Sequence, residues 1–114
     1  MDPGSEFVEL AVEVFSMLAD ATRVRIVLAL NHAGEMSVNH LADVVDKSPA
    51  AVSQHLAKLR LARMVVPRRD GTTVFYRLAD EHAVALVVDA IRQAEHAIAN
   101  GTTPHHHTGT GAHA

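Results

Sequence analysis

The sequence predicts a single, mainly α-helical domain that carries a two-stranded β-wing. The chain has 114 residues, of which 48% are apolar, so it can form one small core. Only 4% of the residues are aromatic, which means that leucine, valine, isoleucine and alanine must fill this core, as in closely packed helices. Apolar residues recur at helical spacing except in two short runs that flank Asp70-Gly71.

The first residues are set apart from this domain. The run Gly4-Ser5-Glu6-Phe7 is the translation of two cloning sites that are commonly placed in tandem, so residues 1–7 are interpreted as a cloning remnant. A first helix is expected over residues 8–18, where apolar residues form one stripe and acidic residues lie outside it. The domain itself is expected to span residues 8–100.

Two short helices are expected next, over residues 24–30 and 38–45. Side chains with capping oxygens precede each of them, and a glycine follows the first. These end signals are Asp20 and Thr22 before the first helix, Gly34 after it, and Ser37 before the second. In the second helix, Leu41, Val44 and Val45 are expected to face inward and the acidic residues to face water.

A fourth helix is expected from Pro49 to about Arg63. The turn Asp46-Lys47-Ser48 leads into it. Proline suits the first helical position because its missing N–H would have no partner there. Within the helix one apolar stripe is spaced to pack inward, which leaves the opposite face free. The stripe consists of Val52, Leu56 and Leu59.

A hairpin and a last helix complete the pattern. Residues 64–67 and 73–78 are strand-like, and the Asp-Gly pair between them is a strong hairpin signal. Residues 83–98 are apolar nearly all round, more than one covered face requires, so this helix is expected to pack against its own copy in a dimer. Residues 101–114 are rich in Gly, Thr and His and are expected to form a disordered, His-rich tail.

Positive charge is concentrated between Lys47 and Arg77. This segment holds seven of the ten Lys and Arg residues and one acid, Asp70, although the whole chain has a net charge of −3. Two short helices, a tight turn and a two-stranded ribbon form a winged helix-turn-helix, whose second helix enters the major groove of duplex DNA. The segment is therefore interpreted as the surface that binds a double-stranded DNA operator.

The side chains on this surface suit two kinds of DNA contact. Ser53 and Gln54 carry donors and acceptors that can read base edges, whereas lysine and arginine suit phosphates, and His55 is expected to contact a phosphate or a base. The alternative for any single arginine is an ordinary solvated face, but their concentration in one unit favours DNA. The predicted DNA-binding residues are Ser48, Ala50, Ser53, Gln54, His55, Lys58, Arg60, Arg68, Arg69 and Thr72.

Several function classes are disfavoured by what the sequence lacks. It has no cysteine, which excludes disulfides, thiolate metal sites and thiol catalysis. It contains no His-Glu-x-x-His, nucleophile elbow or phosphate loop, so an enzyme is not expected. No apolar run is long enough to span a bilayer, so we expect a cytoplasmic protein without a membrane partner. A protein-only interaction module would leave the charge segregation unexplained.

Three motifs occur together along the chain: Leu-Ala-Asp-Ala-Thr-Arg at 18–23, Ser-Gln-His-Leu-Ala-Lys-Leu at 53–59, and Arg-Asp-Gly-Thr-Thr-Val-Phe-Tyr-Arg-Leu at 69–78. Over residues 8–98 the chain thereby resembles the ArsR/SmtB family of metal-responsive bacterial repressors. The resemblance implies the element order α-α-α-α-β-β-α, a homodimer through the first and last helices, and operator binding that metal weakens. It also implies a Cys-x-Cys metal site at the start of the third helix in many members, but Ser37 and Asn39 occupy those positions here.

A second family site, on the last helix, is better matched. Asp80 and His82 match its first pair of ligands and His96 its last, while Gln93 departs from the pattern. Glu95 beside His96, followed by the tail, instead resembles the nickel- and cobalt-sensing branch of actinobacteria or, alternatively, the nickel-dependent superoxide dismutase regulators of streptomycetes. The ligands implied by the resemblance are Asp80, His82, Glu95 and His96, with His105 and His106 from the tail.

One copy of the last helix cannot form this site alone. His82 and His96 are fourteen residues apart, which corresponds to about 21 Å along a helix. Two antiparallel copies can bring Asp80 and His82 of one subunit beside Glu95 and His96 of the other. Such ligands suit nickel, cobalt or zinc, and no metal is needed for folding. The alternative is a degenerate site in a regulator that acts constitutively or with a separate metal-sensing co-regulator protein.

Overall fold

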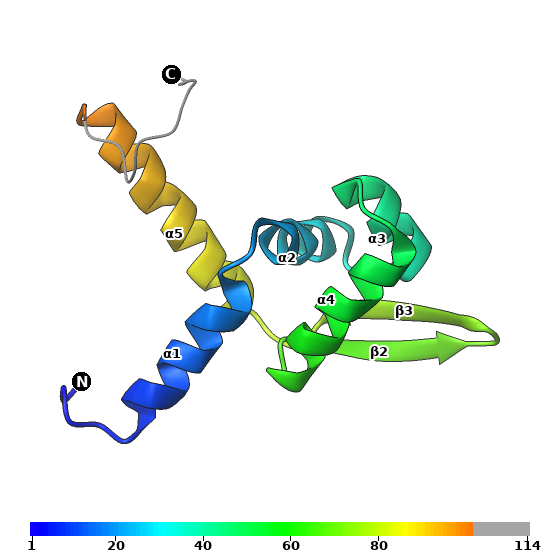
Figure 1. Ribbon diagram of the computed structural model, residues 1–114, viewed down its shortest axis with the longest axis horizontal. Coiled ribbons are helices and arrows are strands. Elements are labelled where there is room, and N and C mark those ends of the chain that lie inside the picture. Colours follow the sequence, from blue (N-terminus) through cyan, green and yellow to red (C-terminus); the bar gives the residue numbers. More distant parts are fainter. Residues whose placement is uncertain (102–114) are drawn as a thin grey trace.

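The computed structural model describes residues 1–101, and within them the elements follow the predicted order apart from one additional short strand, β1. The helices are α1 (Phe7–Leu18), α2 (Ala21–Ala33), α3 (Val38–Val45), α4 (Pro49–Leu61) and α5 (His82–Ala99), and the strands are β1 (Met36–Ser37), β2 (Val65–Asp70) and β3 (Thr73–Leu78). Figure 1 shows α2, α3 and α4 at the centre, the β2–β3 hairpin extending to one side, and α1 and α5 diverging on the other. The mainly helical, winged helix-turn-helix class is confirmed.

Side-chain caps fix the starts of the three central helices. In each case a side-chain oxygen accepts the hydrogen bond of the backbone N–H three positions later, which satisfies a donor that has no partner within the helix. The three pairs are Asp20 Oδ1 with the N–H of Arg23 (3.0 Å), Ser37 Oγ with that of His40 (3.2 Å), and Ser48 Oγ with that of Ala51 (3.1 Å). Thr22, the other candidate cap for α2, is instead buried within the helix. Gly34 follows α2 at φ +86°, as expected for its end.

The core lies where α2, α3 and α4 meet the base of the hairpin. Its most completely buried side chains are Ile26, Val27, Leu30, Leu41, Val52, Leu56, Leu59 and Val65. The prediction for Val44 is wrong, because this side chain is 55% exposed. The buried stripe of α3 runs through Leu41, Ala42 and Val45, and Val44 lies about 60° from Leu41 on the side away from Ala42.

The sheet contains one strand more than the sequence predicted. β1 pairs with β3, opposite the side on which β2 pairs, so the strand order is β1-β3-β2 and both pairings are antiparallel. The register of the short pairing is Met36 with Tyr76 and Ser37 with Phe75. β2 is also longer than predicted, since Arg68, Arg69 and Asp70 pair with the start of β3. Its proline, Pro67, is tolerated because β2 lies at the edge of the sheet.

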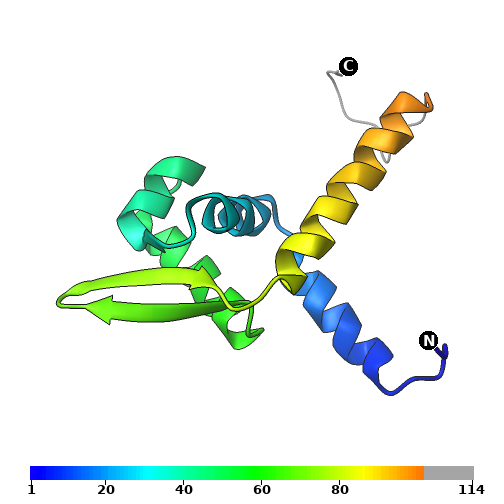
Figure 2. The same cartoon turned by 180° about the vertical axis from the view of Figure 1, so that it is seen from behind.

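Helices α1 and α5 diverge from the core rather than packing along one another, as Figure 2 shows from behind. The radius of gyration is 16.0 Å, compared with about 13 Å for a compact chain of 100 residues. No residue of α1 is buried, and the large apolar side chains exposed on these two helices are Phe7, Val8, Leu10, Val12, Phe15, Ile91 and Ile98. A hollow of about 300 Å³ between the helices is lined mainly by apolar side chains, including Phe15, Leu86 and Ile91.

The exposed apolar face of α5 belongs to the helix whose pattern predicted a partner, and the resemblance to the family implied that the first helix would join it in the interface. Across residues 1–101, none of the helices combines the length and the apolar character required to cross a membrane.

Candidate nucleic-acid interface

The orientation of α4 is set by its buried side. Val52, Leu56 and Leu59 are each 0% exposed, so the opposite side of the helix must face solvent. The side chains on that exposed side are Ala50, Ser53, Gln54, Ala57, Lys58, Arg60 and Leu61. Of these, Ala57 and Leu61 were not predicted to meet DNA, although apolar side chains of this kind can contact the methyl group of thymine. The predicted base-reading pair, Ser53 and Gln54, lies on the exposed face.

A tight turn connects α3 to α4 and sets the orientation of α4. Asp46 adopts a left-handed conformation at φ 57° and ψ 51°, and the N–H of Lys47 donates to the carbonyl of Ala42 at 3.1 Å. Ser48 then caps α4 through its hydroxyl oxygen, which leaves the hydroxyl proton available to donate to a phosphate. Ser48 therefore caps α4 while its residue stays exposed at the start of that helix.

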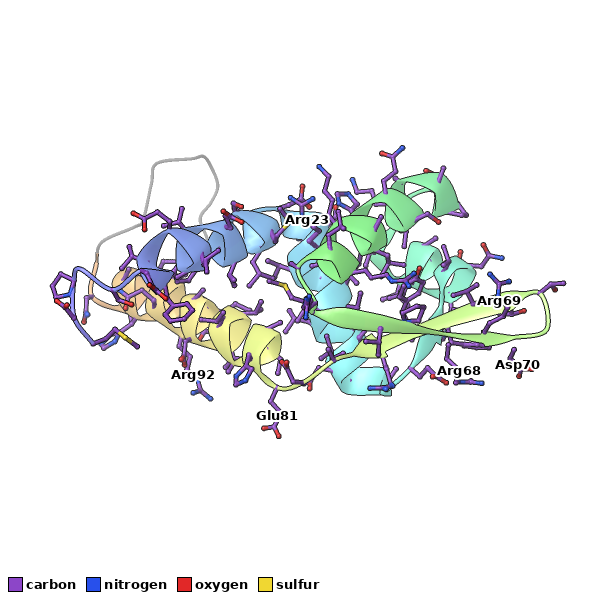
Figure 3. The ribbon with its side chains drawn as sticks, turned by 90° about the horizontal axis from the view of Figure 1, so that it is seen from below. Arg23, Arg68, Arg69, Asp70, Glu81 and Arg92 are labelled. Carbon is purple, nitrogen blue, oxygen red and sulfur yellow. The ribbon has the colours of Figure 1, made fainter. Side chains whose placement is uncertain are left out.

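The structure places the two adjacent arginines of the wing on opposite faces of the hairpin. Successive side chains of a strand alternate between faces, and Figure 3 shows Arg68 and Arg69 on either side of the ribbon. Arg69 lines a hollow of about 340 Å³ together with Arg60 of α4, Pro67, Val74 and Tyr76. Two guanidinium groups, one from α4 and one from the wing, thus border one recess beside the recognition helix.

Arg68, in contrast, lies on the other face of the wing, where its guanidinium group is hydrogen-bonded to Glu35. Its Nε donates to Oε2 of Glu35 at 3.0 Å and its Nη2 to Oε1 at 2.7 Å, and its guanidinium carbon lies 5.0 Å from the centre of the Phe75 ring. The hydrogen bonds from Arg68 lower the pKa of Glu35, and those to Glu35 raise the pKa of Arg68. The other predicted phosphate ligands, Lys58, Arg60 and Arg69, form no ion pair within the described part of the chain.

His55 is turned toward the start of α2 rather than straight out from α4. Its Nδ1 lies 4.0 Å from Oδ1 of Asp20, and its side chain is only 22% exposed. The backbone N–H of Arg23 is the main cause of a lowered pKa of Asp20; burial opposes this, and the charges of His55 and Arg23 add to it. The sequence indicated Asp20 only as a cap and gave no sign of its proximity to His55, because thirty-five positions separate them. Thr72, the remaining predicted contact, is exposed in the turn at the tip of the wing.

The predicted metal ligands lie at the two ends of α5 and are not brought together within one subunit. Asp80 precedes the helix, and its Oδ1 accepts the N–H of His82 at 2.9 Å. Glu95 and His96 are exposed near the other end. No cluster of three or more His, Cys, Asp or Glu residues suited to a metal occurs in residues 1–101. The tail positions His105 and His106 lie outside the described residues.

Comparison with known proteins identifies the family. Residues 20–66, from the cap of α2 to the start of β2, match the family described as "Bacterial regulatory protein, arsR family". The chain is 58% identical over 102 residues to the HTH-type transcriptional regulator KmtR of Mycobacterium tuberculosis, covering 90% of this chain and 76% of that protein. It is 38% identical over 92 residues to the transcriptional repressor SmtB of the same species, covering 81% of this chain and 67% of the relative.

Solved structures agree with the fold. A homodimeric winged helix-turn-helix DNA-binding domain from Mycobacterium bovis superposes with a TM-score of 0.73 at 25% identity, covering 94% of this chain and 100% of that one. The similarity thus extends beyond the helix-turn-helix to nearly the full chain. The chain therefore belongs to the ArsR/SmtB family of winged helix-turn-helix transcriptional regulators, which are DNA-binding proteins and not enzymes.

Proposed function

We propose that the protein is a homodimeric repressor whose affinity for operator DNA is lowered by nickel or cobalt, or by zinc, bound between the α5 helices of two subunits. One observation carries this proposal. On one side the chain exposes a basic surface whose Lys58, Arg60 and Arg69 form no ion pair within residues 1–101. On the other side it exposes apolar side chains of α1 and α5, with imidazole and carboxylate groups at both ends of α5.

The dimer is supported by the apolar faces of α1 and α5. Phe15 is 57% exposed and Ile91 is 37% exposed, and both line the hollow between these helices. Contiguous apolar surface of this kind marks an interaction site in a soluble protein. A second copy of the chain would cover it and would display two α4 helices together, as the two half-sites of an operator require.

The metal site is supported by the chemistry of its residues. Asp80 and His82 would act with Glu95 and His96 of the second subunit, because the helix axis keeps the two pairs far apart within one chain. Nitrogen and oxygen ligands without sulfur suit nickel, cobalt and zinc. Nickel and cobalt favour six ligands, so His105 and His106 are proposed as additional donors.

Metal binding and DNA binding would be coupled through the arrangement of the two subunits. The α4 helices must match successive major grooves, and their separation depends on how the two α5 helices pack. A metal that binds more tightly to an arrangement unsuited to DNA must weaken DNA binding by the same factor. Repression would therefore be relieved when the metal is abundant.

The second candidate is a winged-helix regulator whose metal site is degenerate. It is favoured by the hydrogen bond that Asp80 accepts from the N–H of His82, since this carboxylate already serves the start of α5. Gln93, at a family ligand position, supports the same interpretation. Such a protein would act constitutively or with a separate co-regulator that senses the metal.

Fluorescence anisotropy with the duplex upstream of the protein's own gene distinguishes the two candidates. Adding Ni²⁺, Co²⁺ or Zn²⁺ to the wild type is expected to weaken binding by about 5- to 150-fold, the usual range of allosteric coupling. The His82→Ala variant should lose this response, whereas His32→Ala, changed at an exposed histidine of α2, should keep it. Affinity that no metal alters would contradict the first candidate and support the second.

A further inference from the structure

The start of α2 and the side of α4 form a corner in which Asp20 has so far been given no role beyond that of a helix cap. Asp20 is held rigidly there because its Oδ1 accepts the N–H of Arg23 at 3.0 Å. The same oxygen lies 4.0 Å from Nδ1 of His55, which projects from α4. Both side chains are partly exposed, Asp20 by 35% and His55 by 22%, so a ligand can approach them.

Arg23 adds a second cation to this corner. Its charge acts on Asp20 alongside that of His55, and Figure 3 places it where α2 meets α4. Its Nε is buried and has no hydrogen-bond partner within the described residues. Two basic side chains thus lie near one carboxylate, which leaves the corner with a net positive charge when His55 is protonated.

We infer that Asp20, Arg23 and His55 form a phosphate-binding element at the edge of the recognition helix, and that DNA binding there takes up a proton on His55. The inference rests on the proposed DNA-binding function. It adds a role for Asp20, which orients His55 toward a phosphate of the DNA backbone. The phosphate belongs to the duplex that α4 reads.

The donor and acceptor pattern of imidazole explains the proton uptake. A neutral imidazole has one N–H donor and one acceptor nitrogen. Nδ1 lies on the side of the ring that faces Asp20, at 4.0 Å from Oδ1, so a neutral ring can turn its single N–H either toward the carboxylate or, through Nε2, toward a phosphate. Only the doubly protonated ring presents an N–H to both groups at once. Histidine is suited to this role because it changes charge near neutral pH.

The surrounding charges set the balance between the two protonation states. Asp20, from α2, favours the protonated ring, and Arg23, from the same helix, opposes it. Lys58, three residues after His55 on α4, also opposes it. A DNA phosphate adds a negative charge that favours the protonated ring, since opposite charges within about 4–6 Å stabilise each other. DNA binding is therefore expected to favour uptake of a proton by His55.

The test is the pH dependence of DNA binding by the full chain. Anisotropy titrations with the upstream duplex, between about pH 6 and pH 8 at fixed ionic strength, should show the Kd falling as pH falls. Uptake of one proton per subunit corresponds to a limiting change of about tenfold per pH unit for each His55. His55→Gln should remove this dependence. Asp20→Asn, which keeps a capping side chain, should weaken it.

His32→Gln serves as the matched control, because this histidine is exposed at the opposite end of α2, and it should behave as the wild type. Thermal unfolding would verify that each variant is folded. An affinity that is independent of pH in the wild type, or a pH dependence that persists in His55→Gln, would overturn the inference while leaving the proposed function intact. An unchanged profile in Asp20→Asn would overturn the positioning role of Asp20. Absence of duplex binding at every pH would contradict the proposed function itself.

Discussion

The salt dependence of DNA binding should separate Arg69 from Arg68, although the two are neighbours in the sequence. Arg69 borders the recess beside α4, whereas Arg68 is paired with Glu35 on the other face of the wing. Replacing Arg69 by alanine should remove one phosphate contact from each subunit. Replacing Arg68 should remove none, because its guanidinium already has an anionic partner and points away from α4.

The size of the effect follows from counterion release. Four of the exposed cations, Lys47, Lys58, Arg60 and Arg69, lie on the turn before α4, on the exposed side of α4 and on the face of the wing beside α4. If each contacts one phosphate, the dimer makes about eight contacts and log K should fall against log salt with a slope of about −7. Arg69→Ala leaves about six contacts and a slope of about −5. Between 50 and 200 mM salt, the wild type should therefore lose roughly 10⁴-fold in affinity and the variant roughly 10³-fold.

Anisotropy titrations of the upstream duplex at four or more salt concentrations would measure these slopes. Arg68→Ala is the matched control, since it removes the same side chain one position away, and its slope should equal that of the wild type. Circular dichroism would verify that the wing variants remain folded. Equal reductions of slope in the two variants would show that both arginines contact phosphates and would refute the division of the wing into two faces.

Three further measurements test the core, the dimer and the cap. Leu59→Ala should lower the free energy of unfolding by about 2–5 kcal/mol because Leu59 is 0% exposed, whereas Leu61→Ala, at an 83% exposed position of the same helix, should change it by less than about 0.5 kcal/mol in denaturant titrations. Ile91→Glu should convert the dimer to monomer in sedimentation experiments, while Arg92→Glu, which also introduces an acid into α5, should not; an unchanged dimer in Ile91→Glu would place the interface elsewhere. The backbone N–H of Arg23 lowers the pKa of Asp20 in the folded protein. The charged carboxylate therefore stabilises the fold at pH values above about 4, the pKa of Asp20 in the unfolded chain. This stabilisation is lost as the pH falls through the lower pKa of the folded state. The difference in unfolding free energy between wild type and Asp20→Asn should accordingly shrink below about pH 4, and a difference that stays constant would show that the carboxylate is not the cause.

Much of the fold could be predicted because its signals are local. Each of the caps Asp20, Ser37 and Ser48 acts on a backbone N–H three residues away, and the first two were predicted as caps from their neighbours alone. Ser48 was predicted only to lie in the turn before Pro49 and to contact DNA, and the structure adds its capping role. Gly71 turns the hairpin at φ +64°, a conformation that glycine adopts without strain. The inward stripe of α4 follows directly from helical periodicity.

The features that escaped prediction depend on residues far apart in the sequence. β1 has only two residues and exists because β3, almost forty positions later, offers an unpaired edge. The Arg68–Glu35 pair spans thirty-three positions, and the Asp20–His55 contact thirty-five. Val44 was misplaced because helical spacing in an eight-residue helix does not reveal which side meets its neighbours. Such relations become visible only once the chain is folded.

The short strand β1 has a mechanical consequence for how such a regulator can respond. Immediately before α3 begins, β1 pairs with β3, and this pairing connects the β2–β3 wing to the α3–α4 helix-turn-helix at a second point. The ion pair between Arg68 of the wing and Glu35, which precedes β1, stabilises the same connection. A hinge at the base of the hairpin would have to break both attachments. A change in the position of α5 would therefore move the wing and the α3–α4 helix-turn-helix together as one rigid unit. The response would be a change in the distance between the two such units of a dimer rather than a bend within either.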